Sequence, residues 1–307
     1  MAIEHASVEV VRKPWGVRDL RPWSDIDGSG GAVGELWFHR PDQSAPISAL
    51  LLKLLFTSAP LSIQVHPDDA FARSIGLPNG KTEAWYILSA RPGAQVALGL
   101  KRHLTPQELR ASIRDGSIAD LVQWRPVAKG DVLFVPAGTI HAIGAGIVLA
   151  EIQQRSDTTF RLFDYGRQRE LHEDSAVAVS NAGPARIQSA PRHLTDNRTV
   201  LIAGPHFVLE RINLPANSSW ALNAAPETWV LTLDGHAAIG LARTSTGEVL
   251  FVGGDRASIE VGPNGLGGLI AYPASAPLPS LLKNINAHSD ASPPLPAPQF
   301  AATEAKT

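Results

Sequence analysis

Three short segments at the edges of predicted β-strands carry the side chains that a divalent metal ion prefers. Their sequences are Gln64-Val65-His66-Pro67, Gly80-Lys81-Thr82-Glu83 and Pro136-Ala137-Gly138-Thr139-Ile140-His141. Gln64 and His66 are two residues apart, so on a strand their side chains point to the same face. Two imidazoles, a carboxylate and an amide oxygen, with room left for water or substrate, suit a catalytic zinc-like site better than a closed structural one. The fold must therefore bring several strand ends together.

Most of the remaining sequence is typical of short strands separated by turns. The 307 residues include 26 glycines and 24 prolines, as expected for such an arrangement. Predicted strands cover residues 34–38, 47–56, 62–66, 83–88, 93–98, 130–135 and 147–152, and a further series lies between 200 and 271. The segment Thr105-Pro106-Gln107-Glu108 differs, because a capping hydroxyl, a first-turn proline and a glutamate three residues on predict a helix start. We therefore expect a mainly β protein with a small helical insertion near 105–122, broken at Gly116.

Composition excludes several classes of protein. The net charge of −2 and the pI of about 6.6 give no indication of a nucleic-acid or membrane-surface partner. Cysteine is absent, which excludes disulfides, thiolate metal ligands and a cysteine nucleophile. The N-terminal segment has no apolar run of signal-peptide length, and no stretch approaches the roughly 20 apolar residues of a membrane helix. These features favour a cytoplasmic protein, and they do not predict an oligomeric state.

A weak internal repeat suggests two similar β-modules. Glu83-Ala84-Trp85-Tyr86-Ile87 resembles Glu227-Thr228-Trp229-Val230-Leu231, and Gly130-Asp131 with Gly138 resembles Gly254-Asp255 with Gly262. On the second alignment His141 falls opposite Gly265, and no counterpart of the Gln64 and His66 pair precedes Glu227. We therefore predict a catalytic metal-binding module at 1–190, a second module at 191–286 without the metal site, and a disordered tail at 287–307.

Each candidate ligand also has an ordinary structural explanation. A lone histidine on an apolar strand is more often a satisfied core or surface group than a ligand, and the neighbouring prolines and glycines can simply mark turns. The set is more informative, because small antiparallel barrels bring strand ends to one mouth, and a buried unpaired Glu83 would be costly without a cation or donor. The polar run at 151–167 has two explanations as well, namely side chains that face a wet cavity or a solvated edge strand.

Four separated motifs carry a family resemblance. They are Ser62-Ile63-Gln64-Val65-His66-Pro67-Asp68, Gly80-Lys81-Thr82-Glu83-Ala84-Trp85-Tyr86, Pro136-Ala137-Gly138-Thr139-Ile140-His141-Ala142, and Glu151-Ile152-Gln153-Gln154 with Ser156-Asp157-Thr158-Thr159. In this order they resemble class I mannose-6-phosphate isomerase, most closely its short bacterial form. The resemblance is specific from about residue 10 to residue 170 and general beyond. Arg155 departs from the pattern, since the family more often has a small or polar residue there.

The resemblance implies a fold and a metal site. The fold would be two jelly-roll β-barrels of the cupin type, one behind the other. The site would hold one zinc ion through His66, Glu83 and His141, with Gln64 as the fourth ligand. The same nitrogen and oxygen ligands could also hold manganese, cobalt or nickel.

The resemblance further implies that Arg161, Lys81 and Glu151 are catalytic and that mannose 6-phosphate and fructose 6-phosphate are interconverted. Such an isomerisation moves a proton between C1 and C2 through a cis-enediol(ate), which a divalent metal can stabilise. Glu151 is the first choice for the base and Asp157 the second, provided that burial raises the pKa of the carboxylate. Lys81 and Arg161 can stabilise the oxyanion or hold the phosphate, and these two tasks stay unassigned.

Two other functions fit parts of the pattern. A dioxygenase-like cupin enzyme would hold iron with two histidines and a carboxylate, which His66, Glu83 and His141 satisfy. It would leave Gln64, Lys81 and Arg161 without a role. A non-catalytic sugar-phosphate-binding cupin would be free to lose any catalytic residue, yet here they occur together.

Overall fold

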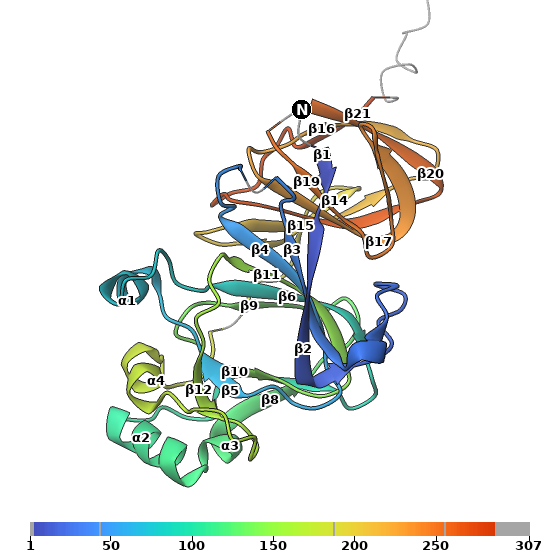
Figure 1. Ribbon diagram of the computed structural model, residues 1–307. Coiled ribbons are helices and arrows are strands. Elements are labelled where there is room, and N and C mark those ends of the chain that lie inside the picture. Colours follow the sequence, from blue (N-terminus) through green and yellow to red (C-terminus); the bar gives the residue numbers. More distant parts are fainter. Residues whose placement is uncertain (1–2, 43, 187, 255, 286–307) are drawn as a thin grey trace, which may run out of the picture.

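Antiparallel β-sheets make up most of the computed structural model, which describes residues 3–42, 44–186, 188–254 and 256–285 (Figure 1). The tail predicted at 287–307 lies outside the described residues. The helices found in the described part of the chain are η1 (Gly28–Gly30), α1 (Asp69–Ser74), α2 (Pro106–Asp115), α3 (Ile118–Leu121) and α4 (Glu173–Val179). None of these is long and apolar enough to cross a membrane.

Two sheets pack against each other to form the first β-module. The six-stranded sheet has the order β2 (Ser7–Val17), β3 (Val33–His39), β4 (Leu50–Phe56), β11 (Ile147–Gln154), β6 (Glu83–Ala90), β9 (Val132–Val135). The five-stranded sheet has the order β12 (Phe160–Phe163), β5 (Ile63–Val65), β10 (His141–Ile143), β7 (Gln95–Leu100), β8 (Val122–Pro126). Trp85 and Leu149 from the first sheet share one apolar cluster with Val96 and Leu98 from the second. The ends of strands from both sheets can therefore meet at one mouth.

A third sheet forms the second β-module. Its main path is β1 (Ile3–His5), β19 (Val249–Val252), β17 (Thr228–Ile239), β20 (Arg256–Tyr272), β15 (Val208–Leu214), β14 (Arg198–Ala203), β13 (Arg192–Thr195). Off this path lie β16 (Ser219–Asn223), β18 (Ala242–Ser245) and β21 (Leu282–Asn284). The pairing of β17 with β20 shifts register twice, and such bulges bend strands. The bent sheet encloses a cluster that includes Trp220, Ile259 and Tyr272. The mainly β class with two jelly-roll modules is thus confirmed.

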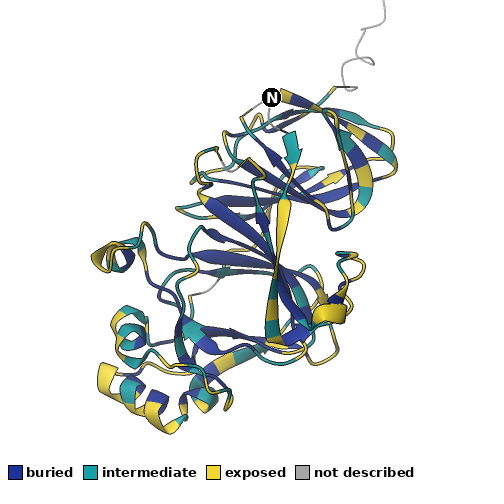
Figure 2. Ribbon diagram, viewed as in Figure 1, coloured by how far each residue is buried: buried dark blue, intermediate teal, exposed yellow. Residues whose placement is uncertain are grey.

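The two modules share a buried apolar layer (Figure 2). Ala84 and Tyr86 of β6 belong to the same cluster as Leu209 and Leu231 of the third sheet. The carboxylate of Glu227 accepts hydrogen bonds from the backbone N–H groups of residues 49 and 50, at 2.6 and 2.8 Å. The N-terminal strand β1 pairs with β19, so residues 3–5 lie in the third sheet. The division of the chain near residue 190 stays a prediction.

The predicted helical insertion is confirmed, because local signals determine it. Thr105 Oγ1 accepts a hydrogen bond from the Glu108 N–H, and the Glu108 carboxylate accepts one from the Thr105 N–H. Gly116 ends the helix with φ 80°, a conformation that favours glycine. Leu109 and Ile118 pack on the outer side of the five-stranded sheet. Helix α4, which the sequence did not predict, lies beside α2 and is joined to it by Glu173.

Candidate metal centre and active site

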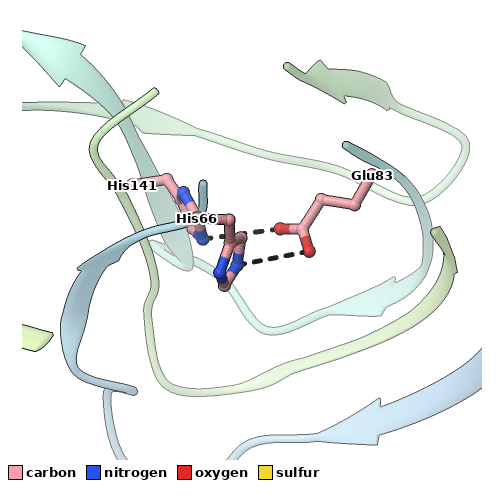
Figure 3. A group of neighbouring side chains, drawn as sticks. All are labelled: His66, Glu83 and His141. Carbon is pink, nitrogen blue, oxygen red and sulfur yellow. Dashed lines mark ion pairs between the residues drawn. The ribbon is translucent and has the colours of Figure 1, made fainter. Parts of the chain in front are cut away.

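His66, Glu83 and His141 meet at the mouth of the first module (Figure 3). Glu83 begins β6, His141 begins β10 and His66 directly follows β5. One ligand atom from each residue lies within 4.8 Å of the others, and all three side chains are buried. The distances are 3.5 Å from His66 Nε2 to Glu83 Oε2 and 3.4 Å from His141 Nε2 to Glu83 Oε1. These residues could hold a metal ion.

The histidines present lone pairs, not protons, to this carboxylate. Nδ1 of His66 donates to the Thr158 carbonyl at 2.9 Å, and Nδ1 of His141 donates to the Thr139 carbonyl at 2.8 Å. Each Nε2 is therefore left with a lone pair when the imidazole is neutral. Burial lowers the pKa of His141 to about 4 and that of His66 well below its ordinary value. Both imidazoles are consequently neutral near pH 7, the state that binds metals.

One oxygen of Glu83 lacks the partner that its burial demands. The residue is fully buried, and Oε1 has no hydrogen-bond partner among the described residues. Burial and the nearby Glu151 raise the pKa of Glu83. A carboxylate facing two nitrogen lone pairs is unfavourable unless a cation lies between them. The donor set, its burial and this orphaned oxygen all fit a divalent cation.

Gln64 lies beside the three residues, as its spacing from His66 predicted. It pairs with His141 across β5 and β10, and its amide nitrogen is 3.3 Å from His141 Nε2. Ser62 Oγ donates to the other end of the amide at 3.1 Å. Rotation of the amide by half a turn would present its oxygen to the same space. Its role as a fourth ligand remains a prediction.

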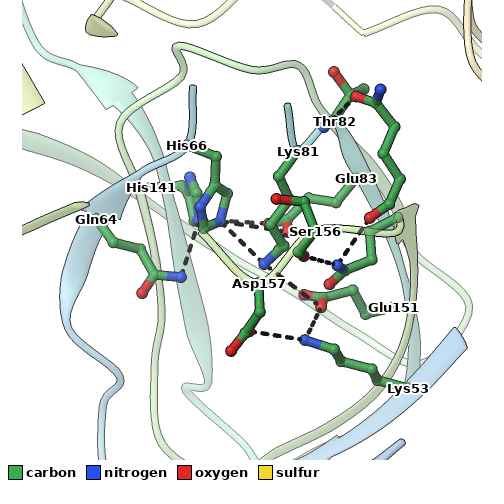
Figure 4. A network of polar contacts seen from close by, with 12 residues as sticks. Lys53, Gln64, His66, Lys81, Thr82, Glu83, His141, Glu151, Ser156 and Asp157 are labelled. Carbon is green, nitrogen blue, oxygen red and sulfur yellow. Dashed lines mark hydrogen bonds and ion pairs between the residues drawn. The ribbon is translucent and has the colours of Figure 1, made fainter. Parts of the chain in front are cut away.

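A chain of alternating charges runs from the histidine pair into the six-stranded sheet (Figure 4). Nζ of Lys81 is 2.9 Å from Glu83 Oε2 and 3.8 Å from Glu151 Oε1. Nζ of Lys53 is 3.7 Å from Glu151 Oε1 and 3.8 Å from Glu35 Oε2. Lys81, Glu151 and Lys53 are all at least 95% buried. The structure thus brings the predicted Lys81 and Glu151 together next to the three residues that could hold a metal ion.

Lys53 is the residue that our sequence analysis missed. It is 2% exposed, and its Nζ lies 4.0 Å from the centre of the Trp37 ring. It is the single charged residue in the buried strand Leu-Leu-Leu-Lys-Leu-Leu-Phe. A lysine in so apolar a strand is rarely buried without a partner. The lone lysine in an apolar strand is a signal that the sequence does contain. The sequence does not show which carboxylates lie beside it.

The pKa of Glu151 does not meet the condition stated above for a general base, namely that burial raises it. Burial alone would raise it, but the ammonium groups of Lys81 and Lys53 outweigh burial and lower the pKa below its ordinary value. Trp85 Nε1 also donates to Glu151 Oε2 at 3.2 Å. The condition of a raised pKa is therefore not met, because two lysines converge on this carboxylate, which no pattern in the sequence reveals. Glu151 is therefore ionised near pH 7.

Asp157 and Arg161 lie farther out. The side chain of Asp157 is 66% exposed, and its carboxylate is 3.6 Å from Lys53 Nζ. Arg161 pairs with Gln64 across β12 and β5, which places the two side chains on one face. Its guanidinium donates to the carbonyl of Glu170 at 3.1 Å. Burial and the neighbouring Arg169 lower the pKa of Arg161. Both residues lie outside the buried network, with Arg161 on the same sheet face as Gln64 and His141.

The end of β11 organises the loop at 154–158 over the site. Gln153 Nε2 donates hydrogen bonds to the carbonyls of Gln154 and Ser156. Two residues after Ser156, the carbonyl of Thr158 accepts a hydrogen bond from His66 Nδ1. Gln153 Oε1 is buried without a hydrogen-bond partner among the described residues. Strand β11 lies between β4 and β6, so the alternative of a solvated edge strand is wrong for residues 151–154. Arg155 instead turns away toward His39, at 3.3 Å.

Comparison with known proteins gives a consistent result. No protein-family model matches the chain. The mannose-6-phosphate isomerase of Streptococcus mutans is 37% identical over 206 residues, which are 64% of this chain and 65% of that protein. The mannose-6-phosphate isomerase ManA of Bacillus subtilis is 35% identical over 209 residues, 62% of this chain and 64% of its own length. The chain resembles these isomerases. It spans slightly less than two thirds of the length of each.

Solved structures show the same fold over nearly the whole chain. The crystal structure of the Bacillus subtilis mannose 6-phosphate isomerase matches with a TM-score of 0.76 and 22% identity, covering 89% of this chain and 100% of that chain. A variant of phosphomannose isomerase from Salmonella typhimurium matches with a TM-score of 0.70 and 15% identity, covering 89% and 100%. At these identities the likeness supports the two-module architecture and no more.

Proposed function

We propose that this protein is a metal-dependent aldose–ketose isomerase that interconverts mannose 6-phosphate and fructose 6-phosphate. The observation that carries the proposal is the contact between two buried neutral histidines, the orphaned Glu83 carboxylate and the cation of Lys81. The similarity to curated mannose-6-phosphate isomerases over 206 and 209 residues supports the choice of substrate.

The metal site comprises His66, Glu83 and His141, with Gln64 as the fourth ligand. Zinc is our choice of metal, because imidazole and carboxylate ligands with an open position are typical of catalytic zinc. A bound divalent ion would polarise the sugar carbonyl and stabilise the negative charge that develops on its oxygen. Thr158 and Thr139 would fix the orientation of the two imidazoles through their carbonyls.

Glu151 is the proposed base that moves the proton between C1 and C2. It is ionised, lies within the buried network and has Lys81 and Lys53 on either side. These ammonium groups would remain charged throughout and offset the negative charge of the enediolate. Asp157 is the second candidate, but it is largely exposed. A buried carboxylate is better shielded from proton exchange with bulk water.

Arg161 is the proposed anchor for the phosphate. It lies on the same face as Gln64 and outside the buried network, which is where the charged end of an open-chain sugar phosphate would lie. A guanidinium can bind two phosphate oxygens at once. Lys81, deep in the site, would then act on the reacting end of the sugar. In this proposal Arg161, near the surface, binds the phosphate, and Lys81, deeper in the site, stabilises the oxyanion.

The other functions are less consistent with the site. A dioxygenase-like enzyme has no use for two buried lysines flanking a carboxylate, because an oxidisable substrate develops no comparable charge there. A sugar-phosphate-binding protein without activity would not need Glu151 between Lys81 and Lys53. We also propose a cytoplasmic location, a sugar phosphate as the partner, and a division into the modules 1–190 and 191–286.

Incubation of metal-loaded protein with fructose 6-phosphate tests the proposal, with mannose 6-phosphate as the measured product. We expect turnover that EDTA removes and zinc restores. Metal analysis of the same sample identifies the ion. Absence of turnover in protein with one metal per chain would contradict the proposed reaction, and iron with oxygen uptake would favour the dioxygenase.

A further inference from the structure

A cavity of about 250 Å³ lies between the two modules, on the other side of β6 from the metal ligands. Side chains alternate along a strand. Trp85 therefore belongs to the interior cluster of the first module, whereas Tyr86 and Leu88 belong to the layer between the modules. Tyr86 and Leu88 line the cavity together with Arg211 of β15 and Leu233 of β17. The cavity is thus separate from the proposed catalytic site.

The Tyr86 hydroxyl is the first polar group of this cavity that has no partner in the protein. The residue is 3% exposed, and its hydroxyl makes no hydrogen bond within the described ranges of the chain. Burial raises its pKa, and Arg211 and Asp234 are close enough to influence it. Because the hydroxyl has no partner in the protein, it can donate a hydrogen bond to a molecule bound in the cavity or accept one from it.

Arg211 is the second unsatisfied group. Its Nε is buried without a hydrogen-bond partner, and the side chain makes no ion pair with any described residue. Arg198 on the adjacent strand shows the usual solution, because it donates to both oxygens of Glu210, at 2.9 and 2.8 Å. The two arginines differ, because Arg198 is paired within the chain whereas Arg211 lines the cavity without such a partner. Its guanidinium is therefore available to a group bound in the cavity.

Two charged residues complete the lining. Lys129 lies in the turn before β9, and Asp234 lies at a bulge in β17. Neither forms a hydrogen bond or an ion pair with its side chain in the part of the chain that the structure describes. The two cations exceed the single carboxylate by one charge, so the lining favours an anion. Tyr86 and Asp234 offer partners for hydroxyl groups, while Trp23, Leu88 and Leu233 provide apolar contact.

We propose that this cavity binds a small hydroxylated anion, either a sugar phosphate or a sugar acid. Its anionic group would lie against Arg211 and Lys129, and its hydroxyls would reach Tyr86 and Asp234. Pockets for drug-sized ligands are typically about 300–1,000 Å³, so a cavity slightly below this range suits a single sugar unit. This site goes beyond the proposed isomerase reaction and does not depend on it.

Isothermal titration calorimetry with α-glucose 1-phosphate and with gluconate tests the proposal. Neither probe has a free aldehyde or ketone group, so neither can be isomerised. We expect saturable binding of at least one, and the better probe identifies phosphate or carboxylate as the anionic group. Arg211→Gln should weaken binding by about tenfold or more, since it removes a charge-assisted contact. Tyr86→Phe should weaken it by about threefold to tenfold.

Arg243→Gln is the matched control, because Arg243 is an exposed arginine of the same module outside the cavity. It should bind the probe as the unaltered protein does. Tyr86→Phe loses no hydrogen bond of the described structure, so it should fold even if Arg211→Gln does not. No saturable binding of either probe at millimolar concentration would overturn the proposal. Binding that is unchanged in both Arg211→Gln and Tyr86→Phe would overturn it equally, whatever the isomerase assay shows.

Discussion

Lys53 and Glu151 lie directly opposite each other on β4 and β11, with Nζ 3.7 Å from Oε1 and both side chains almost fully buried. Residues directly opposite in an antiparallel pair have neighbouring side chains, so the register of the sheet creates this contact. A lysine on a strand of leucines thereby becomes part of the site.

Replacement of Lys53 by methionine should reduce kcat/KM by about a hundred- to a thousandfold, the usual effect of losing one group that stabilises developing charge. The metal content should stay normal, because Lys53 does not contact the histidines. Steady-state kinetics and metal analysis check this result. Lys13→Met is the control, since Lys13 is partly exposed and contacts Glu35 only at 3.7 Å. An unchanged kcat/KM in Lys53→Met would show that Lys53 has no role in catalysis.

Replacement of His141 by alanine should abolish metal binding and activity together. The substitution removes one of the three groups that could hold the ion, namely the imidazole 3.4 Å from the Glu83 oxygen that has no hydrogen-bond partner. His5→Ala should change neither, because His5 is exposed in β1. Metal content after dialysis is the decisive measurement. A fully loaded His141→Ala protein would show that the ion binds elsewhere.

Comparison of Glu151→Gln with Asp157→Asn should identify the base. We expect Glu151→Gln to keep its metal and to lose about a hundred- to ten-thousandfold in kcat, as is usual for a general base. Asp157→Asn should remain within about tenfold of the unaltered protein, because exposed ion pairs contribute little. Transfer of a C2 deuterium of mannose 6-phosphate to C1 of the product provides a direct readout. The reverse order of effects would assign the base to Asp157.

Replacement of Gln153 by glutamate should weaken metal affinity by about ten- to a hundredfold, as expected for a group that supports a ligand indirectly. The new carboxylate would face the carbonyls of Gln154 and Ser156, which now accept hydrogen bonds from the amide. The loop that holds His66 through Thr158 would loosen. Competition with a chelator measures the affinity.

Gln123→Glu is the matched control for that experiment. Gln123 also donates its amide to the next backbone carbonyl, at 3.1 Å, but it is exposed on β8. It should leave the affinity unchanged. Equal affinities in the two variants would show that Gln153 does not position His66.

Asp164 should make stability depend on pH in the acid range. Burial alone would raise its pKa, but hydrogen bonds from Arg169 and Arg167 outweigh burial and lower the pKa. Because the folded state has the lower pKa, the stabilisation is fully present above the unfolded pKa of about 4 and is lost as the pH falls through the folded value. Denaturant unfolding at several pH values should therefore show a loss of stability in Asp164→Asn at pH 7 that shrinks below pH 4. A pH-independent difference would contradict this assignment, and Asp196→Asn serves as an exposed control.

Local signals in the sequence predicted much of the fold. The capping hydroxyl of Thr105 and the glycine at 116 specify one helix by contacts within a few residues, and the structure confirms both. The two-residue spacing of Gln64 and His66 places them on one face for the same local reason. Short helix α4 was missed, because its position depends on contacts with α2.

The sequence by itself determined the residue types of this protein's site, namely two imidazoles, a carboxylate and an amide at strand ends. Only the tertiary structure decided which charges meet. The contact between Lys53 and Glu151 joins residues almost a hundred positions apart, and it depends on the register of β4 against β11. The downward pKa shift of Glu151 and the unsatisfied Arg211 between the modules have the same origin. Coulomb energy and desolvation depend on distance in space, and distance along the chain does not reveal them.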